Sequence, residues 1–119
     1  MIKNIFFDID GTIMGKSGTI SKELVSVLQQ YKQKGVKYGV ATGRPLFAAK
    51  KVIEELQANG CSMVFSGALI IDPSLNDPIY ESLLSRETIK NFVTSAIENE
   101  FFVEAYNLDS YFSFFEHPY

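Results

Sequence analysis

The chain has 119 residues, 46% of them hydrophobic and 21% charged, and its 11 basic and 14 acidic residues give a net charge of −3. This composition is typical of a folded globular protein and excludes a disordered chain. The sequence has no basic stretch for nucleic acid and no apolar stretch long enough to span a bilayer, so we expect neither partner. The single cysteine, Cys61, allows no disulfide within the chain and predicts a reducing, cytoplasmic location.

The first half of the chain alternates between strand-like and helix-like patterns. Ser21 is a predicted N-cap and Gly35 a predicted stop for one helix, and Pro45 begins a second helix that ends at residues 59–60. Four apolar residues at helical spacing predict the buried face of the second helix: Ala49, Val52, Ile53 and Leu56. Three short apolar runs predict buried strands: residues 2–8, 36–41 and 63–65. This order predicts an α/β fold with a Rossmann-like parallel sheet.

The pattern changes after the third predicted strand. We predict a partial Rossmann-like core over residues 1–78 and the beginning of an α+β cap module over residues 79–119. The aromatic residues near the end of the chain alternate as in sheet packing, which favours a cap core over a surface for stacking ligands. Residues 68–71 and 79–84 are predicted to form an antiparallel hairpin. Ser85 is predicted to cap a helix that runs through Ile97, and two more strands are predicted at residues 101–106 and 111–115.

Two aspartates stand where the first predicted strand ends. Asp8 closes the apolar run, and Asp10 follows two residues later, before Gly11. Side chains two apart on a strand point the same way, so both carboxylates should project from the edge of the sheet where ligands bind in open α/β folds. Two like charges this close are costly unless a proton or a cation offsets them. We therefore expect Asp8 and Asp10 to hold Mg²⁺, which prefers hard oxygen ligands.

Such a pair suits the hydrolysis of a phosphate monoester. Asp8 can act as a nucleophile that forms an aspartyl-phosphate. Asp10 can protonate the leaving oxygen and later activate water. The alternative is that two aspartates near a glycine only form a turn. The apolar strand before them and the motif after the second strand favour the catalytic interpretation.

The next two strand ends carry candidate phosphate-binding residues. Thr42, Gly43 and Arg44 follow the second strand and precede a helix, whose free amides favour an anion. Ser66 and Gly67 follow the third strand at the same edge. The alternatives are that Thr42 only caps the helix, that Arg44 is an ordinary surface charge and that Ser66 is a turn residue.

These motifs resemble those of the haloacid dehalogenase-like (HAD) hydrolases. Residues 8–12 (DIDGT) are similar to the first motif of that superfamily, and residues 41–44 (ATGR) and 65–70 (FSGALI) resemble its Cof-type sugar-phosphatase subfamily. The resemblance implies a magnesium-dependent phosphatase of small phosphorylated metabolites. It implies that Asp8 is the nucleophile, Asp10 the general acid/base and Thr42 a ligand of the phosphoryl group. Magnesium would be held by the carboxylate of Asp8 and the main-chain carbonyl of Asp10.

The chain departs from the family pattern in two respects. Ser66 stands where the family usually has asparagine, and the phosphate-binding lysine and later acidic motif of longer members have no counterpart here. We therefore expect an incomplete metal site with weak or no turnover. We also expect the first strand to lie at a sheet edge, where it can pair with another chain. The alternative function is a non-catalytic, truncated fragment that binds phosphate or a partner chain.

Overall fold

The structure is a computed structural model, and it describes residues 2–15, 17–75 and 77–114. These residues belong to two compact units, Met1–Glu81 and Ser82–Tyr119. The division falls after residue 81, close to the domain boundary that the sequence predicts after residue 78. Each unit is described by itself.

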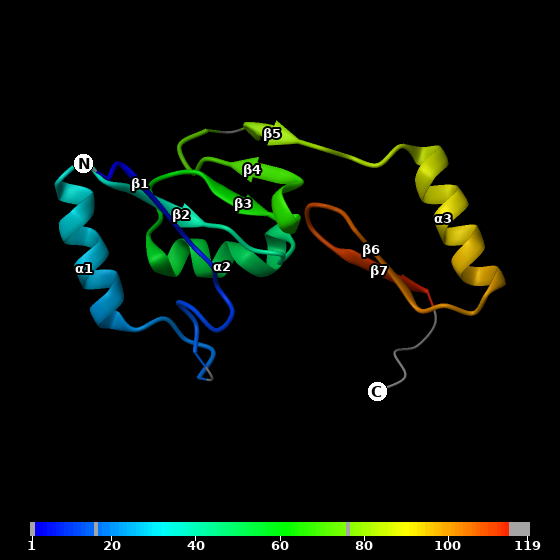
Figure 1. The fold of residues 1–119 in the computed structure, drawn as a ribbon, viewed down its shortest axis with the longest axis horizontal. Helices are drawn as coiled ribbons and strands as arrows, with labels where there is room; N and C mark the ends of the chain where they lie inside the picture. Colours follow the sequence, from blue (N-terminus) through cyan, green and yellow to red (C-terminus); the bar gives the residue numbers. More distant parts are fainter. Residues whose placement is uncertain (1, 16, 76, 115–119) are drawn as a thin grey trace. The chain divides into compact units, whose positions relative to one another are not determined.

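The first unit combines a short parallel pair of strands with an antiparallel hairpin (Figure 1). β1 pairs with β2 in parallel, and β2 is linked to β3 by a single parallel bridge between Ala41 and Met63. β3, β4 and β5 then pair in antiparallel fashion, so the predicted α/β core and the predicted hairpin are both confirmed. The elements are β1 (Asn4–Phe7), α1 (Lys22–Gln33), β2 (Lys37–Val40), α2 (Leu46–Leu56), β3 (Ser62–Val64), the 3₁₀ turn η1 (Phe65–Gly67), β4 (Leu69–Ile71) and β5 (Tyr80–Glu81).

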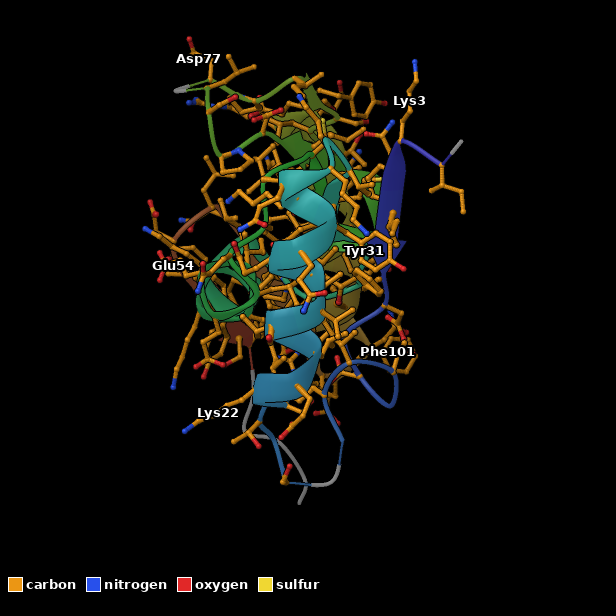
Figure 2. The ribbon with its side chains drawn as sticks, turned by 90° about the vertical axis from the view of Figure 1, so that its left-hand side faces the viewer. Lys3, Lys22, Tyr31, Glu54, Asp77 and Phe101 are labelled. Carbon is orange, nitrogen blue, oxygen red and sulfur yellow. The ribbon has the colours of Figure 1, made fainter. Side chains whose placement is uncertain are left out.

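Both helices cover the same face of the sheet. Tyr38 and Val40 of β2 are almost fully buried on that face, beside Leu28 of α1. The predicted face of α2 is confirmed, since the four residues predicted for it are all buried. In Figure 2, α1 and α2 lie side by side, marked by Tyr31 and Glu54.

The first strand is less buried than its composition predicts. Ile5 and Phe7 pack against the core, but Phe6, on the other face, is 48% exposed. The prediction of a buried strand is therefore wrong for the face that carries Phe6, whereas the expected position at a sheet edge is present in the described residues. Among the described residues, β2 is the only strand that pairs with β1, which leaves β1 at the edge of the sheet.

The helix ends follow the capping rules at one position and not at another. The Ser21 side chain accepts a hydrogen bond from the N–H of Leu24, as an N-cap should. The predicted end of α2 at residues 59–60 is wrong, because the helix stops at Leu56 and Gln57 adopts a left-handed conformation with φ 55°. Asn59 is used elsewhere: its side chain accepts from the N–H of Tyr38 at 2.9 Å and so docks the connection onto β2.

The second unit contains α3 (Arg86–Glu98) and a hairpin of β6 (Val103–Tyr106) and β7 (Tyr111–Phe114). The predicted cap is confirmed, since the Ser85 side chain accepts from the N–H of Thr88. The prediction of an aromatic core is wrong for the described residues, because Ala96 and Val103 are the buried apolar residues of this unit, and Phe115 lies outside the described part. The exposed aromatic residues are Phe92, Phe101, Phe102, Tyr106, Tyr111, Phe112 and Phe114.

Among the described residues, no helix is both long enough and apolar enough to cross a membrane.

Candidate active site

The loop after β1 turns two carboxylates outward around a buried anchor. Ile9 is fully buried, whereas its neighbours Asp8 and Asp10 are exposed. The carbonyl of Ile9 accepts from the N–H of Met14 at 2.9 Å, which closes the loop. Gly11 has φ 78°, a left-handed conformation that favours glycine. As predicted for side chains two residues apart, Asp8 and Asp10 lie on the same, solvent side of the chain.

Asp8 makes one local contact. Its Oδ2 accepts a hydrogen bond from the hydroxyl of Thr12 at 3.3 Å. This bond leaves most of the acceptor capacity of the exposed carboxylate open. The sequence motif contains Thr12, but sequence reasoning did not assign it to the site. Its position four residues after Asp8 in the same tight loop was the available signal.

Asp10 is held by a cation from the next strand end. Nε of Arg44 donates to Oδ2 of Asp10 at 2.9 Å, and Nη2 donates to Oδ1 at 2.6 Å. This is the bidentate geometry that a planar guanidinium makes with a carboxylate. Nη2 also lies 3.7 Å from the sulfur of Met14 in the same loop. The structure therefore joins the aspartate loop to the Thr42–Arg44 turn, although the two are more than thirty residues apart.

The ion pair shifts the titration of both partners. Hydrogen bonds from Arg44, supported by its charge, hold the pKa of Asp10 below its ordinary value of 3.8. The same bonds raise the pKa of Arg44. A general acid must carry a proton, and this pairing opposes protonation of Asp10. The pair would therefore have to loosen before Asp10 could donate a proton.

The second and third strand ends are tied together by backbone hydrogen bonds. The N–H of Ser66 donates to the carbonyl of Thr42 at 3.1 Å, and the N–H of Phe65 donates to the carbonyl of Arg44 at 2.9 Å. A Cβ atom placed on Gly43 would lie 3.3 Å from the Ser66 hydroxyl oxygen, so this turn lies close to the Ser66 side chain. These contacts fix the turn from Thr42 to Arg44 against the loop after β3.

Thr42 caps its own turn rather than the following helix. It is 7% exposed, and its Oγ1 accepts from the N–H of Arg44 at 3.1 Å. Pro45 occupies the N-cap position of α2 and makes no side-chain capping bond, so α2 begins one residue later than predicted. The hydroxyl of Thr42 keeps its own hydrogen for another acceptor.

The loop after β3 holds three consecutive residues with positive φ. Phe65, Ser66 and Gly67 have φ values of 51°, 55° and 93°. Residues other than glycine rarely adopt this conformation, and clusters of it are found at functional sites. Ser66 lies at the surface beside Gly43, whereas no described contact joins Gly67 to the other site residues.

The oxygen atoms near Asp8 fit magnesium in part. The Asp8 carboxylate is exposed, and within the described residues the main-chain carbonyl of Asp10 accepts no hydrogen bond. One carboxylate, one carbonyl and several waters can hold Mg²⁺. The Asp10 carboxylate is engaged by Arg44, and the described part of the chain has no cluster of three acidic, histidine or cysteine side chains.

Comparison with solved structures first defines the class of protein. The crystal structure of a hypothetical protein from Geobacillus kaustophilus superposes on 99% of this chain and 45% of its own, with a TM-score of 0.86 at 24% identity. A protein described as a HAD subclass IIB sugar phosphatase superposes on 93% of this chain and 43% of its own, with a TM-score of 0.73 at 22% identity. These similarities define an α/β fold, and this chain covers less than half the length of either structure.

Sequence comparison then gives the family. The family profile described as haloacid dehalogenase-like hydrolase matches residues 5–117. A Streptococcus pyogenes protein that carries a provisional phosphatase name is 30% identical over 87 residues, which are 71% of this chain and 32% of that protein. The chain belongs to the haloacid dehalogenase-like hydrolases. It spans about a third of the length of the curated relatives that it matches.

Proposed function

We propose that this sequence carries the nucleophile half of a magnesium-dependent phosphatase active site. The observation that carries the proposal is the arrangement at the sheet edge. There Asp8 is exposed directly after β1, and Asp10 is joined to Arg44 beside the buried Thr42. A nucleophile, an acid/base and donors for an anion are the groups that phosphoryl transfer through an aspartyl-phosphate needs.

Each residue would have a defined part in the reaction. A carboxylate oxygen of Asp8 attacks phosphorus, the bond to the leaving oxygen breaks, and Asp10 gives that oxygen its proton. Water then attacks phosphorus and loses a proton to Asp10, which releases inorganic phosphate and restores Asp8. Thr42, Gly43, Arg44, Ser66 and Gly67 would surround the phosphoryl group. Bound Mg²⁺ would neutralise charge between the phosphoryl oxygens and Asp8.

The proposed substrate is a small phosphorylated metabolite. One structural neighbour is named as a sugar phosphatase, and the family profile is that of hydrolases. The net charge of −3 and the lack of a basic stretch favour a small ligand over nucleic acid. A cytoplasmic location remains part of the proposal, because a reducing compartment suits a chain with one cysteine.

The test is hydrolysis of p-nitrophenyl phosphate by the chain and by Asp8→Asn. We expect weak turnover that requires Mg²⁺ and disappears in the variant, because an amide cannot act as the nucleophile. Ser26→Ala, an exposed change in α1, serves as the control and should behave as the parent chain does. Turnover that survives Asp8→Asn would exclude Asp8 as the nucleophile.

A second candidate function is pairing with another chain through β1. The observation in its favour is the edge of β1 with which no described strand pairs: Phe6 of β1 is 48% exposed, and Ile2, just before the strand, is 72% exposed. Unpaired strand edges with apolar side chains promote pairing between chains. Analytical ultracentrifugation tests this: we expect a dimer that weakens in Phe6→Lys, and a monomer at high concentration would contradict it.

A further inference from the structure

Arg44 has a fixed main chain and a partly exposed side chain. Its N–H donates to Thr42 Oγ1, and its carbonyl accepts from Phe65, so neighbouring loops hold the backbone on both sides. The side chains of Arg44 and Asp10 are 30% and 61% exposed, so water competes with their ion pair. The contact with the sulfur of Met14 is weak. The guanidinium can therefore change partners without a change in the main chain.

The guanidinium also has donors to spare. It carries five N–H groups, and the described contacts use those on Nε and Nη2. No described residue accepts from Nη1. A phosphate ester group offers three oxygens and up to two negative charges, more than the single carboxylate of Asp10. Arginine binds phosphate with the same bidentate geometry that it uses for carboxylates.

We propose that Arg44 exchanges partners: Asp10 holds its guanidinium in the free protein, and the phosphoryl group takes it over when substrate binds. This inference rests on the proposed function, because it requires the phosphoryl group to bind beside Thr42 and Arg44. The exchange releases the Asp10 carboxylate when the substrate is in place. Arg44 is then both a ligand of the phosphoryl group and a positioning residue for Asp10.

A double-mutant cycle on the binding of inorganic phosphate tests the exchange. Calorimetry would be performed on the parent chain, Asp10→Asn, Arg44→Gln and the double variant. We expect Asp10→Asn to raise phosphate affinity about tenfold, because Arg44 is then free to make about one more charge-assisted hydrogen bond to the phosphate. In the Arg44→Gln background, the same change should raise affinity by less than about twofold, because no guanidinium remains to be released.

Two further variants separate exchange from general effects of charge. Glu23→Gln removes one negative charge from the exposed first turn of α1 and should leave phosphate affinity unchanged. Arg44→Lys keeps the positive charge without the bidentate geometry and should recover part of the affinity that Arg44→Gln loses. Circular dichroism would verify that each variant is folded.

An equal gain from Asp10→Asn in both Arg44 backgrounds would overturn the exchange, because the gain would then reflect charge removal alone. Absence of phosphate binding in Asp10→Asn would overturn it as well, since the released Arg44 would then take no phosphate. The proposed function is judged separately, by whether a fluoroberyllate group binds in a manner that depends on Asp8. That binding can persist when the exchange fails, so the two failures are distinguishable.

Discussion

Two side-chain hydrogen bonds reinforce the few main-chain hydrogen bonds that join β2 and the residues after it to residues 59–63. The N–H of Val40 donates to the hydroxyl of Ser62 at 3.1 Å, and the N–H of Tyr38 donates to the side-chain oxygen of Asn59. Ser62 is fully buried, so its hydroxyl is the partner that the buried Val40 N–H needs. Sequence periodicity could not reveal this role, because the predicted strand began at residue 63, and a serine or asparagine between a predicted helix and a predicted strand is an ordinary loop residue.

Removal of the Ser62 hydroxyl should therefore destabilise the first unit. We expect Ser62→Ala to lower the free energy of unfolding by about 1–3 kcal/mol, the cost of leaving a buried donor unsatisfied. Urea denaturation followed by circular dichroism measures this. Ser26→Ala, an exposed serine of α1, should change stability by less than about 0.5 kcal/mol. Equal effects of the two substitutions would show that the Ser62 contact does not support the fold.

The Asp10–Arg44 pair makes a prediction about pH. Because the folded pKa of Asp10 is depressed below 3.8, the pair stabilises the fold above that value, and this contribution is lost as the pH falls through the lower, folded pKa. A carbon-13 NMR titration of the Asp10 carboxyl should give a midpoint below 3.8. In Arg44→Gln the midpoint should move upward. A midpoint that does not respond to this substitution would show that the pair does not form in solution.

At the scale of elements, β2 and the chain before β3 approach too closely for a side chain between them. A Cβ atom on Gly39 would lie 1.8 Å from the carbonyl oxygen of Cys61 and 2.9 Å from the hydroxyl oxygen of Ser62. The obstructing oxygen of Cys61 belongs to the main chain and cannot turn away. The α/β core that positions the aspartate loop therefore requires glycine at position 39.

We expect Gly39→Ala to lower the free energy of unfolding by more than about 4 kcal/mol. Single substitutions have an effect of this size only when they create a steric or polar conflict in a core. The variant should be unfolded or insoluble at 25 °C. Gly15→Ala is the matched control, since its Cβ would meet no atom within 4 Å, and it should stay folded. A folded Gly39→Ala with an unchanged thermal midpoint would contradict the close approach.

Several elements were predictable because local chemistry decides them. Ser21 and Ser85 cap their helices as expected, and the apolar period of α2 identified its buried face. The end of α2 was missed because Asn59 docks on β2, a tertiary contact that overrides the local stop signal. The roles of the candidate site residues stay a prediction, but the meeting of their strand ends at one edge was predictable from the order of the elements. The pairing of Asp10 with Arg44 was not, because it depends on how two distant loops are placed.

At the scale of the whole molecule, the exposure of apolar residues is the feature that sequence could not supply. Alternation predicts which residues share a face, but the burial of that face depends on what packs against it. The described residues of α3 bury only Ala96, and the residues of β7 remain exposed. The edge position of the first strand, by contrast, was expected from the sequence, and among the described strands only β2 pairs with it.

The central claim is that Asp8 accepts a phosphoryl group. Fluorine NMR with fluoroberyllate, which mimics a phosphoryl group on a carboxylate, tests it even where turnover is slow. With Mg²⁺ present, we expect bound fluorine signals from the chain, and the control Ser26→Ala should show the same signals. Asp8→Asn should show none. Bound signals of equal intensity in Asp8→Asn, or none from the parent chain, would contradict the assignment of Asp8 as the nucleophile.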